Sequence, residues 1–298
     1  MVRRFLDDGD AVTVFGPSPE PCLSEADVAR LDFVAGDVTD GTALDAAVRA
    51  ARPDVVIGLA AHGGGGRGLL AAASEDEASA LAVNVGGFHN LLQACLRVDV
   101  PRVLWASTLS VFADPALYHG GTVSETSSRR PDTFYGVTKV LAEDLAGFYA
   151  YRLGLRATGL RLPLVFGPGL WYAGVAAQIG RLFEAAVRGK ALSMEVPDAV
   201  VDMMYVKDVA SAFLHLARHD GPLDYVYNVK AFAPTFAELA EMVRKLTRDF
   251  PADFTEVPAE LKYPTMAGDR LRAIGFHPAF SLREACADYL AELRVDME

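Results

Sequence analysis

The chain has 298 residues, 51% of them hydrophobic, which is enough to build a substantial core in one large or two unequal domains. Lys and Arg total 28 against 39 Asp and Glu, so the formal net charge is −11. This balance argues against nucleic-acid or anionic-membrane partners, because both require clustered positive charge. A small-molecule anion remains compatible, since it needs only one or two placed cations.

Metal sites, export signals and membrane spans are not expected either. The three cysteines, Cys22, Cys95 and Cys286, are scattered and form no CxxC motif, and the six histidines form no HExxH pattern. An odd number of unpaired cysteines predicts reduced thiols and no structural zinc. No apolar run has the length of a membrane span, and the N-terminus lacks the apolar stretch of a signal peptide. We therefore expect a cytoplasmic location.

Strand-like and helix-like segments alternate over the first two thirds of the chain. The predicted elements are a helix at Val2–Gly9, strands at Val12–Phe15 and Phe33–Ala35, a helix at Ala43–Ala51, a strand at Val55–Ala60, a helix at Ala78–Arg97, a strand at Arg102–Ala106, a helix at Gly136–Leu153 and a strand at Ala157–Pro163. The wholly apolar run at Val55–Ala60 predicts a strand buried on both faces. This β-α-β-α order predicts an α/β fold with a doubly wound parallel sheet.

After about residue 165 the pattern loosens. A Gly/Pro-rich stretch at Phe166–Gly169 is followed by a helix near Ala176–Arg188, short strands, and late helices at Thr235–Thr247 and Leu282–Arg294. We interpret residues 1–165 as the first domain and residues 166–298 as a smaller C-terminal lobe. Such a lobe would lie over the carboxyl ends of the strands, where ligands bind in open α/β sheets.

The first strand of such a sheet, with its glycine-rich turn, is not found in the sequence. That strand is normally central, and its turn lets the backbone approach a pyrophosphate at a helix N-terminus. Here the chain opens on the helix-like Val2–Gly9, and its glycine run, Gly63–Gly66, follows a later strand. Loss of a central strand leaves unpaired edges, at a cost on the order of 1–3 kcal/mol per buried group. One explanation for the missing strand is that the start of the protein was assigned too far downstream. It predicts an upstream strand and GxxGxxG turn in frame, and an immediate upstream stop codon would contradict it.

Tyr135 and Lys139 are the main candidates for chemistry. They lie four residues apart at the start of a predicted helix, and therefore on one face, one turn apart. A tyrosine with an ordinary pKa of about 10 is a poor acid or base near neutrality. A nearby ammonium lowers the pKa of a phenol and makes it a usable proton donor or acceptor. The hydroxyls of Ser107 and Thr108 end the preceding strand, where one can bond the same substrate oxygen. The alternative is a surface tyrosine and a solvated lysine, because YxxxK arises often by chance.

Nine short motifs follow one another along almost the whole chain. They are Asp37–Asp40, Leu59–Ala61, Asn84–Leu92, Ser107–Phe112, Tyr135–Lys139 with Glu143, Arg161–Pro163, Phe166–Gly169, Tyr205–Ala210 and Leu271–Pro278. Together they resemble an extended short-chain dehydrogenase/reductase of the NAD-dependent epimerase/dehydratase family. The resemblance implies that residues 1–165 form a dinucleotide-binding, Rossmann-like domain without its first strand, followed by a substrate-binding lobe.

The resemblance also implies roles for individual residues. Tyr135 would be the acid/base, Lys139 would lower its pKa and bond the nicotinamide ribose, and Thr108 would be the catalytic hydroxyl. The residues implied at the cofactor, NAD or NADP, are Asp37 and Val38 at the adenine, Leu59, Ala60 and Ala61 along its length, Asn84, Ser107, Tyr135 and Lys139 near the nicotinamide side, and Pro163–Val165 near the carboxamide.

The sequence departs from this family beyond the missing glycine turn. Gly16 stands where an acidic residue usually accepts the ribose hydroxyls, which removes a reason to favour NAD over NADP, yet no Arg follows to receive a 2′-phosphate. Leu164 and Val201 replace an Asn and an Arg that are common in members acting on nucleotide sugars. A nucleotide-sugar substrate is therefore less expected. The candidate substitutes for the lost cation are Arg181, Lys190 and Arg270.

The leading hypothesis is an NAD(P)-dependent oxidoreductase or epimerase acting on a hydroxyl or carbonyl of a small sugar, polyol or sugar-derived acid. Leu109 and Ser110 occupy the places of the acidic pair expected in a dehydratase, which disfavours dehydration. The alternative is a degenerate member that binds dinucleotide poorly and serves as a binding or scaffold protein, or as a non-redox isomerase. The intact Thr108, Tyr135 and Lys139 argue against degeneracy. Family members usually form a homodimer through helices matching residues 80–97 and 136–153, and the same is expected here.

Overall fold

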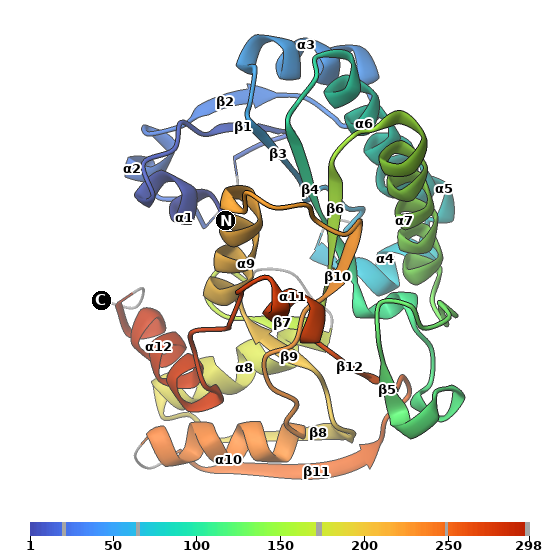
Figure 1. Cartoon of the computed structure of the whole chain (residues 1–298). Coiled ribbons are helices and arrows are strands. Elements are labelled where there is room, and N and C mark those ends of the chain that lie inside the picture. Colours follow the sequence, from blue (N-terminus) through green and yellow to red (C-terminus); the bar gives the residue numbers. More distant parts are fainter. Residues whose placement is uncertain (20–21, 64–65, 171–174, 248–249, 296–298) are drawn as a thin grey trace.

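The computed structural model describes residues 1–19, 22–63, 66–170, 175–247 and 250–295. Two members of the glycine run, Gly64 and Gly65, lie outside these residues. The first part of the chain forms an α/β arrangement, and a lobe of helices and short strands lies at one end of it (Figure 1).

A four-stranded parallel sheet with strand order β10-β6-β4-β3 forms the centre of the first part. Its strands are β3 (Val55–Gly58), β4 (Arg102–Thr108), β6 (Ala157–Leu162) and β10 (Val226–Asn228). Trp105 on β4 is level with Gly159 on β6, where a Cβ would lie 2.7 Å from the indole ring. Glycine at this position therefore allows the largest side chain of the sheet to lie flat against its neighbour. The predicted parallel α/β sheet is confirmed.

A separate parallel pair contains β1 (Thr13–Gly16) and β2 (Asp32–Ala35). Phe15 of β1 packs in the same hydrophobic cluster as Val56 of β3, so the two sheets lie between the same helices. Among the described strands, none pairs with both β1 and β3. In the described part of the chain, one edge of β1 and one edge of β3 therefore have no strand partner.

The expectation that Val55–Ala60 is a strand buried on both faces was wrong. The strand ends at Gly58, its residues are half-buried, and Leu59 beyond it is 46% exposed. Among the described strands β3 pairs with β4 alone, which makes it an edge strand. An apolar strand is fully buried only where neighbouring strands pair with both of its edges, and β3 has a partner on one edge.

Helices cover both faces of the sheets (Figure 1). Helices α3 (Gly41–Ala51), α6 (Phe88–Arg97) and α7 (Phe134–Leu153) pack on one face. Helices α1 (Val2–Asp7), α9 (Val206–Arg218) and α11 (Asp269–Ala273) pack on the other. The predicted helices at the N-terminus and after residue 135 are thus confirmed as α1 and α7. Because α9 and β10 join the first sheet, residues beyond 165 build part of both regions, and the division into domains at that residue stays a prediction.

The predicted helix Ala78–Arg97 is present but its hydrogen bonding changes along its length. It consists of α5 (Glu77–Leu81), the π-helical segment η2 (Ala82–Gly87) and α6, and it follows the short α4 (Leu69–Glu75). π-Helical turns are rare and often mark functional sites. At Gly87 a Cβ would lie 2.5 Å from the Val38 side chain, so glycine lets this turn approach the loop after β2.

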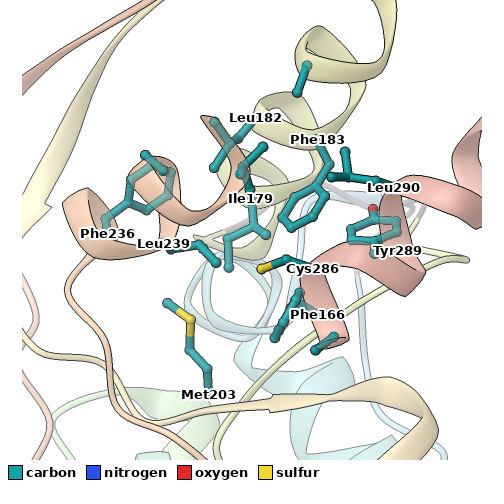
Figure 2. Packing of buried hydrophobic residues seen from close by; sticks show 14 of the residues in the cluster. Phe166, Ile179, Leu182, Phe183, Met203, Phe236, Leu239, Cys286, Tyr289 and Leu290 are labelled. Carbon is teal, nitrogen blue, oxygen red and sulfur yellow. The ribbon is translucent and has the colours of Figure 1, made fainter. Parts of the chain in front are cut away.

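The lobe has a hydrophobic core of its own. Figure 2 shows this core, in which the ring centroids of Phe183 and Tyr289 lie 4.4 Å apart. Its elements are α8 (Val175–Arg188), α10 (Phe236–Leu246), α12 (Leu282–Val295) and the parallel strands β8 (Leu192–Asp198) and β11 (Ala252–Pro258). Two further parallel pairs lie between the lobe and the first sheet, namely β7 (Leu164–Phe166) with β9 (Met203–Tyr205) and β5 (Thr122–Val123) with β12 (Thr265–Met266). The remaining short elements are α2 (Glu25–Val28), η3 (Leu109–Val111), η4 (Pro115–Leu117) and η5 (His119–Gly121).

Candidate active site

The first turn of α7 carries the two main candidates, and its start is fixed by a cap. The Thr133 hydroxyl accepts a hydrogen bond from the Gly136 N–H at 3.1 Å, as a favourable N-cap residue does. The helix ends at Gly154, which adopts the left-handed conformation (φ 74°). Tyr135 and Lys139 both lie on its buried side, with 6% and 5% exposure. The alternative of a surface tyrosine and a solvated lysine is therefore wrong.

Lys139 reaches from α7 to the end of β4. Its Nζ donates to the Ala106 carbonyl oxygen at 2.9 Å and lies 5.7 Å from the centroid of the Tyr135 ring. Burial lowers the pKa of the Lys139 ammonium to about 8, and the carboxylate of Glu143 one turn later opposes that shift. The lysine is thus a buried cation placed between the candidate tyrosine and the strand that carries Thr108.

Ser107 and Thr108 end β4 with different partners. Thr108 is half-buried, and its hydroxyl oxygen accepts from the Ser110 N–H at 3.1 Å, which caps η3. Ser107 is buried, and its hydroxyl donates to Glu143 Oε1 at 2.6 Å. Both hydroxyls lie at the end of β4, as predicted, but the bond from Ser107 to Glu143 was not predicted.

Asn84, in the π-helical segment, joins two parts of the site. Its side chain is buried, Nδ2 donates to Thr138 Oγ1 at 2.9 Å, and Oδ1 accepts from the His62 N–H at 2.7 Å. The Thr138 hydroxyl in turn donates to the Tyr135 carbonyl at 2.7 Å. This chain of hydrogen bonds connects the loop after β3 to the first turn of α7.

The residues expected along the cofactor lie at the carboxyl ends of β2, β3 and β6. Asp37 is exposed, and hydrogen bonds from the backbone N–H and hydroxyl of Thr39 lower the pKa of its carboxyl. The Val38 carbonyl accepts from Asn90 Nδ2 at 3.0 Å. Leu59 and Ala60 expose apolar surface, and Ala61 is half-buried. Pro163 connects β6 to β7, whose half-buried Val165 pairs with Met204.

Some residues around the site were not found from the sequence. Lys230 follows β10, and its Nζ lies 3.3 Å from Oδ1 of the buried Asp202, whose pKa is raised by burial. Oδ2 of the same carboxylate accepts from the Met266 N–H. The candidate cation Arg270 instead pairs with Asp224 at 3.2 Å. Only the placement of Lys230 at a strand end, two residues after Asn228, carries a signal in the sequence.

The sequence matches a known protein family over most of its length. The sequence model described as the NAD dependent epimerase/dehydratase family matches residues 1–229. The chain belongs to this family. The resemblance inferred from the ordered motifs is confirmed.

Individual relatives are dehydrogenases and epimerases. Mitochondrial L-threonine 3-dehydrogenase of Sus scrofa is 35% identical over 182 residues, which cover 57% of this chain and 46% of the relative. L-Arabinose 1-dehydrogenase (NAD(P)(+)) of Haloferax volcanii is 35% identical over 142 residues, covering 44% and 52%. The matches thus span about half the length of these curated relatives.

Solved structures share the fold over nearly the full chain. The UDP-glucose 4-epimerase of Thermus thermophilus in complex with NAD superimposes with a TM-score of 0.82 at 24% identity, covering 98% of this chain and 94% of that one. MoeE5 in complex with UDP-glucuronic acid and NAD gives a TM-score of 0.80 at 26% identity, covering 99% and 94%. The predicted Rossmann-like fold is confirmed.

NAD is the cofactor that the family implies. The residues present suit its adenine and nicotinamide ends, but not the pyrophosphate between them. Leu59 is 46% exposed just after β3, an apolar surface that a bound ring would cover, and the exposed Asp37 follows the end of β2. These features suit the adenine and nicotinamide ends. Between β1 and β3 the described residues supply no strand and glycine turn to receive the pyrophosphate.

In the described ranges, no group of three or more His, Cys, Asp or Glu side chains is arranged to hold a metal ion. The helices of that same part of the chain include none long and apolar enough to cross a membrane.

Proposed function

We propose that this protein is an NAD(P)-dependent oxidoreductase or epimerase that acts on a hydroxyl or carbonyl through Thr108, Tyr135 and Lys139. The observation that carries the proposal is the buried Lys139 ammonium, bonded to Ala106 at the end of β4 and 5.7 Å from the Tyr135 ring. A cation is expensive to bury, so its burial beside a phenol at a strand end supports a catalytic role.

Each residue has a distinct task in this proposal. Tyr135 accepts the proton of the substrate hydroxyl, and the Thr108 hydroxyl bonds the same oxygen and orients it. Lys139 favours the phenolate through its charge and holds the cofactor ribose. NAD, when bound, supplies a nicotinamide ring that accepts hydride from the substrate carbon. Asp37 and Val38 hold the adenine, Leu59, Ala60 and Ala61 line the cofactor, and Asn84, Ser107, Pro163 and Val165 lie near the nicotinamide.

We propose a small sugar, polyol or sugar-derived acid as the substrate, without a nucleotide. Leu164 and Val201 offer neither the amide nor the guanidinium suited to a nucleotide sugar. Lys230, with a side-chain exposure of 26%, is a cation at the carboxyl end of β10, and a substrate carboxylate would share it with Asp202, whose Oδ1 lies 3.3 Å from its Nζ. Relatives named for L-arabinose and uronate support such substrates, and L-threonine, for which another relative is named, is likewise small and carries no nucleotide.

Turnover of a panel of such substrates with NAD and NADP tests the proposal. Tyr135→Phe should abolish the turnover found with wild-type protein while leaving the fold intact. Tyr225→Phe is the matched control, because Tyr225 is half-buried and precedes β10, outside α7 and its exposed face. Equal turnover of wild type and Tyr135→Phe would reject the role of the phenol.

The split between the sheets of β1 and β3 supports a second candidate, a member with impaired dinucleotide binding that serves as a binding or scaffold protein or a non-redox isomerase. Titration with NADH and NADPH, followed by nicotinamide fluorescence, separates the two. For the 298-residue chain we expect weak binding. Sub-micromolar affinity would exclude the second candidate, and turnover without any dinucleotide would favour it.

We propose a cytoplasmic homodimer. The free thiols of Cys22, Cys95 and Cys286 suit a reducing compartment. An exposed apolar stripe on α7, formed by Val137, Leu141, Phe148 and Tyr151 with 37%, 41%, 53% and 72% exposure, offers a surface for a second copy. At 100° per residue these four side chains fall within about 80° of one helix face.

A further inference from the structure

Glu143 is a fully buried carboxylate at the centre of a polar cluster. Its Oε1 accepts from Ser107 Oγ at 2.6 Å and from Arg161 Nε at 2.8 Å. Its Oε2 accepts from Arg161 Nη2 at 2.7 Å and from Arg129 Nη1 at 3.2 Å. The side chains of Glu143 and Arg161 are 0% and 1% exposed, so both charges are removed from water.

Arg161 is held on every side as well. Its Nη1 lies 3.3 Å from the Glu125 carbonyl and 3.4 Å from Asn228 Oδ1, and its guanidinium lies 4.9 Å from the centroid of the Phe112 ring. The two parallel hydrogen bonds to Glu143 fix the plane of the guanidinium. The pair therefore has one geometry and joins α7, β6 and the end of β10.

Stability alone is a weak explanation for such a pair. Two charges lose their hydration on burial, and apolar residues of similar volume in their place are often equally or more stabilising. A buried ion pair does, however, impose a particular arrangement on the elements that it joins. This pair lies next to the candidate active site, so the arrangement that it imposes is that of the end of β4 against α7.

Consecutive residues of β4 are bonded to consecutive turns of α7. Ala106 accepts from Lys139 through its carbonyl, and Ser107 donates to Glu143 through its hydroxyl. Ser107 is also the strand partner of Arg161 on β6. The strand end is thus attached to the helix at two points, directly before Thr108, and Arg161 holds the second point in place.

We propose that Glu143 and Arg161 are positioning residues that act through Ser107 to hold Thr108 in register with Tyr135 and Lys139. This inference rests on the proposed function, because it assigns a purpose to the geometry of that same centre. It requires no contact of Glu143 with substrate or cofactor. A misplacement of about 1 Å at reacting groups costs on the order of 100-fold in rate, so the rate responds to a small loosening of the strand end.

Turnover of a set of variants on the full chain tests the proposal. Ser107→Ala, which keeps the ion pair, should lower kcat by roughly tenfold with KM for the substrate within about twofold. Glu143→Gln should lower kcat further. Glu195→Gln is the matched control, because it makes the same substitution at an exposed position on β8 of the lobe, and it should stay near wild type.

A double variant separates positioning from stability. Glu143→Gln leaves Arg161 buried without its charge partner and can fail to fold, whereas Glu143→Met with Arg161→Met removes both charges together. The double variant should unfold at a urea concentration near that of wild type yet keep the low kcat. Recovery of wild-type kcat in the stable double variant, or wild-type kcat in Ser107→Ala, would overturn the proposal.

The titration of Lys139 tests the positioning role without a measurement of turnover, so it separates this inference from the proposed function. Burial lowers the pKa of Lys139 and Glu143 raises it, while Tyr135 and the Ala106 carbonyl are its other neighbours. The titration of Lys139, followed by NMR of its side chain and assigned with Lys139→Arg, should move to lower pH in Glu143→Gln and stay unchanged in Glu195→Gln. It should also move in Ser107→Ala if the strand end shifts. Absence of turnover in wild type would reject the proposed function, and unchanged titration in both Glu143→Gln and Ser107→Ala would overturn the positioning role.

Discussion

Gly136 of α7 lies directly against the main-chain carbonyl of Ser110, so that a Cβ at Gly136 would come within 2.1 Å of that oxygen. The residue after Tyr135 thereby touches the turn that begins after Thr108. Because the obstacle is backbone, no rotation of a side chain can relieve the contact. The absence of a side chain at this position therefore sets how closely the candidate tyrosine approaches the candidate threonine.

Gly136→Ala should accordingly damage both stability and turnover. Forcing a methyl group into a packed contact costs about 1–3 kcal/mol, and displacement of the first turn of α7 should lower kcat by about 100-fold. Urea unfolding and steady-state kinetics measure the two effects. Gly147→Ala is the control on the same helix, because its Cβ would meet atoms no nearer than 3.9 Å. That variant should be up to about 1 kcal/mol more stable than wild type. Equal stability of the two variants would show that the Ser110 contact is not restrictive.

The buried Lys139 should make stability depend on pH in a defined direction. Its pKa is lowered from 10.5 to about 8 by burial, so between these values the unfolded chain holds a proton that the folded chain has lost. Stability then rises with pH, by up to about 1.4 kcal/mol per pH unit, and the gain is absent below pH 8.

The comparison of wild type with Lys139→Met isolates this effect. The difference in free energy of unfolding should move in favour of wild type as the pH rises from 8 to 10, because the variant has no proton to release at this position. Urea unfolding of both proteins at several pH values in this window measures the difference. A difference that is flat, or that moves against wild type, would show that the Lys139 ammonium does not titrate below its ordinary range.

The sequence predicted the order of elements well where a local signal exists. Alternation of apolar strands with amphipathic helices predicted the parallel sheet, and the YxxxK spacing predicted that Tyr135 and Lys139 share one face of a helix, as they do on α7. Their burial itself was not predicted from spacing, because it depends on α4 and β4, which are remote in sequence.

Other features required long-range information. The exposure of β3 depends on which strands flank it, and nothing in Val55–Ala60 itself records an uncovered edge. The cluster of Ser107, Glu143 and Arg161 joins residues up to 54 positions apart, so the sequence shows each of them in a separate motif but not the contact between them. The π-helical segment around Asn84 likewise follows an amphipathic pattern that predicts one continuous helix.

Asn84→Ala should loosen the loop after β3. Its amide accepts from the His62 N–H at 2.7 Å and donates to Thr138 at 2.9 Å, so its removal leaves a half-buried N–H without its partner. We expect a loss of about 1–3 kcal/mol in the free energy of unfolding and faster hydrogen exchange at the His62 amide. Asn90→Ala is the control, since that amide bonds the Val38 and Thr39 carbonyls instead. Slow exchange at His62 in Asn84→Ala would mean that another group holds the loop.

The apolar stripe on α7 should bury itself against a second copy. Leu141→Glu with Phe148→Glu places two charges on the stripe, and buried unpaired charge opposes association strongly. Wild type should therefore show the mass of a dimer, and the variant that of a monomer, in light scattering coupled to size exclusion. Leu261→Glu is the matched control, because Leu261 is 41% exposed, as is Leu141, but lies in the lobe far along the chain from α7. A monomeric wild type, or a dimer that survives both substitutions on α7, would assign the stripe to some other contact. Because the same helix carries Tyr135 and Lys139, a monomeric variant with reduced turnover would further indicate that association helps to hold the first turn of α7 in place.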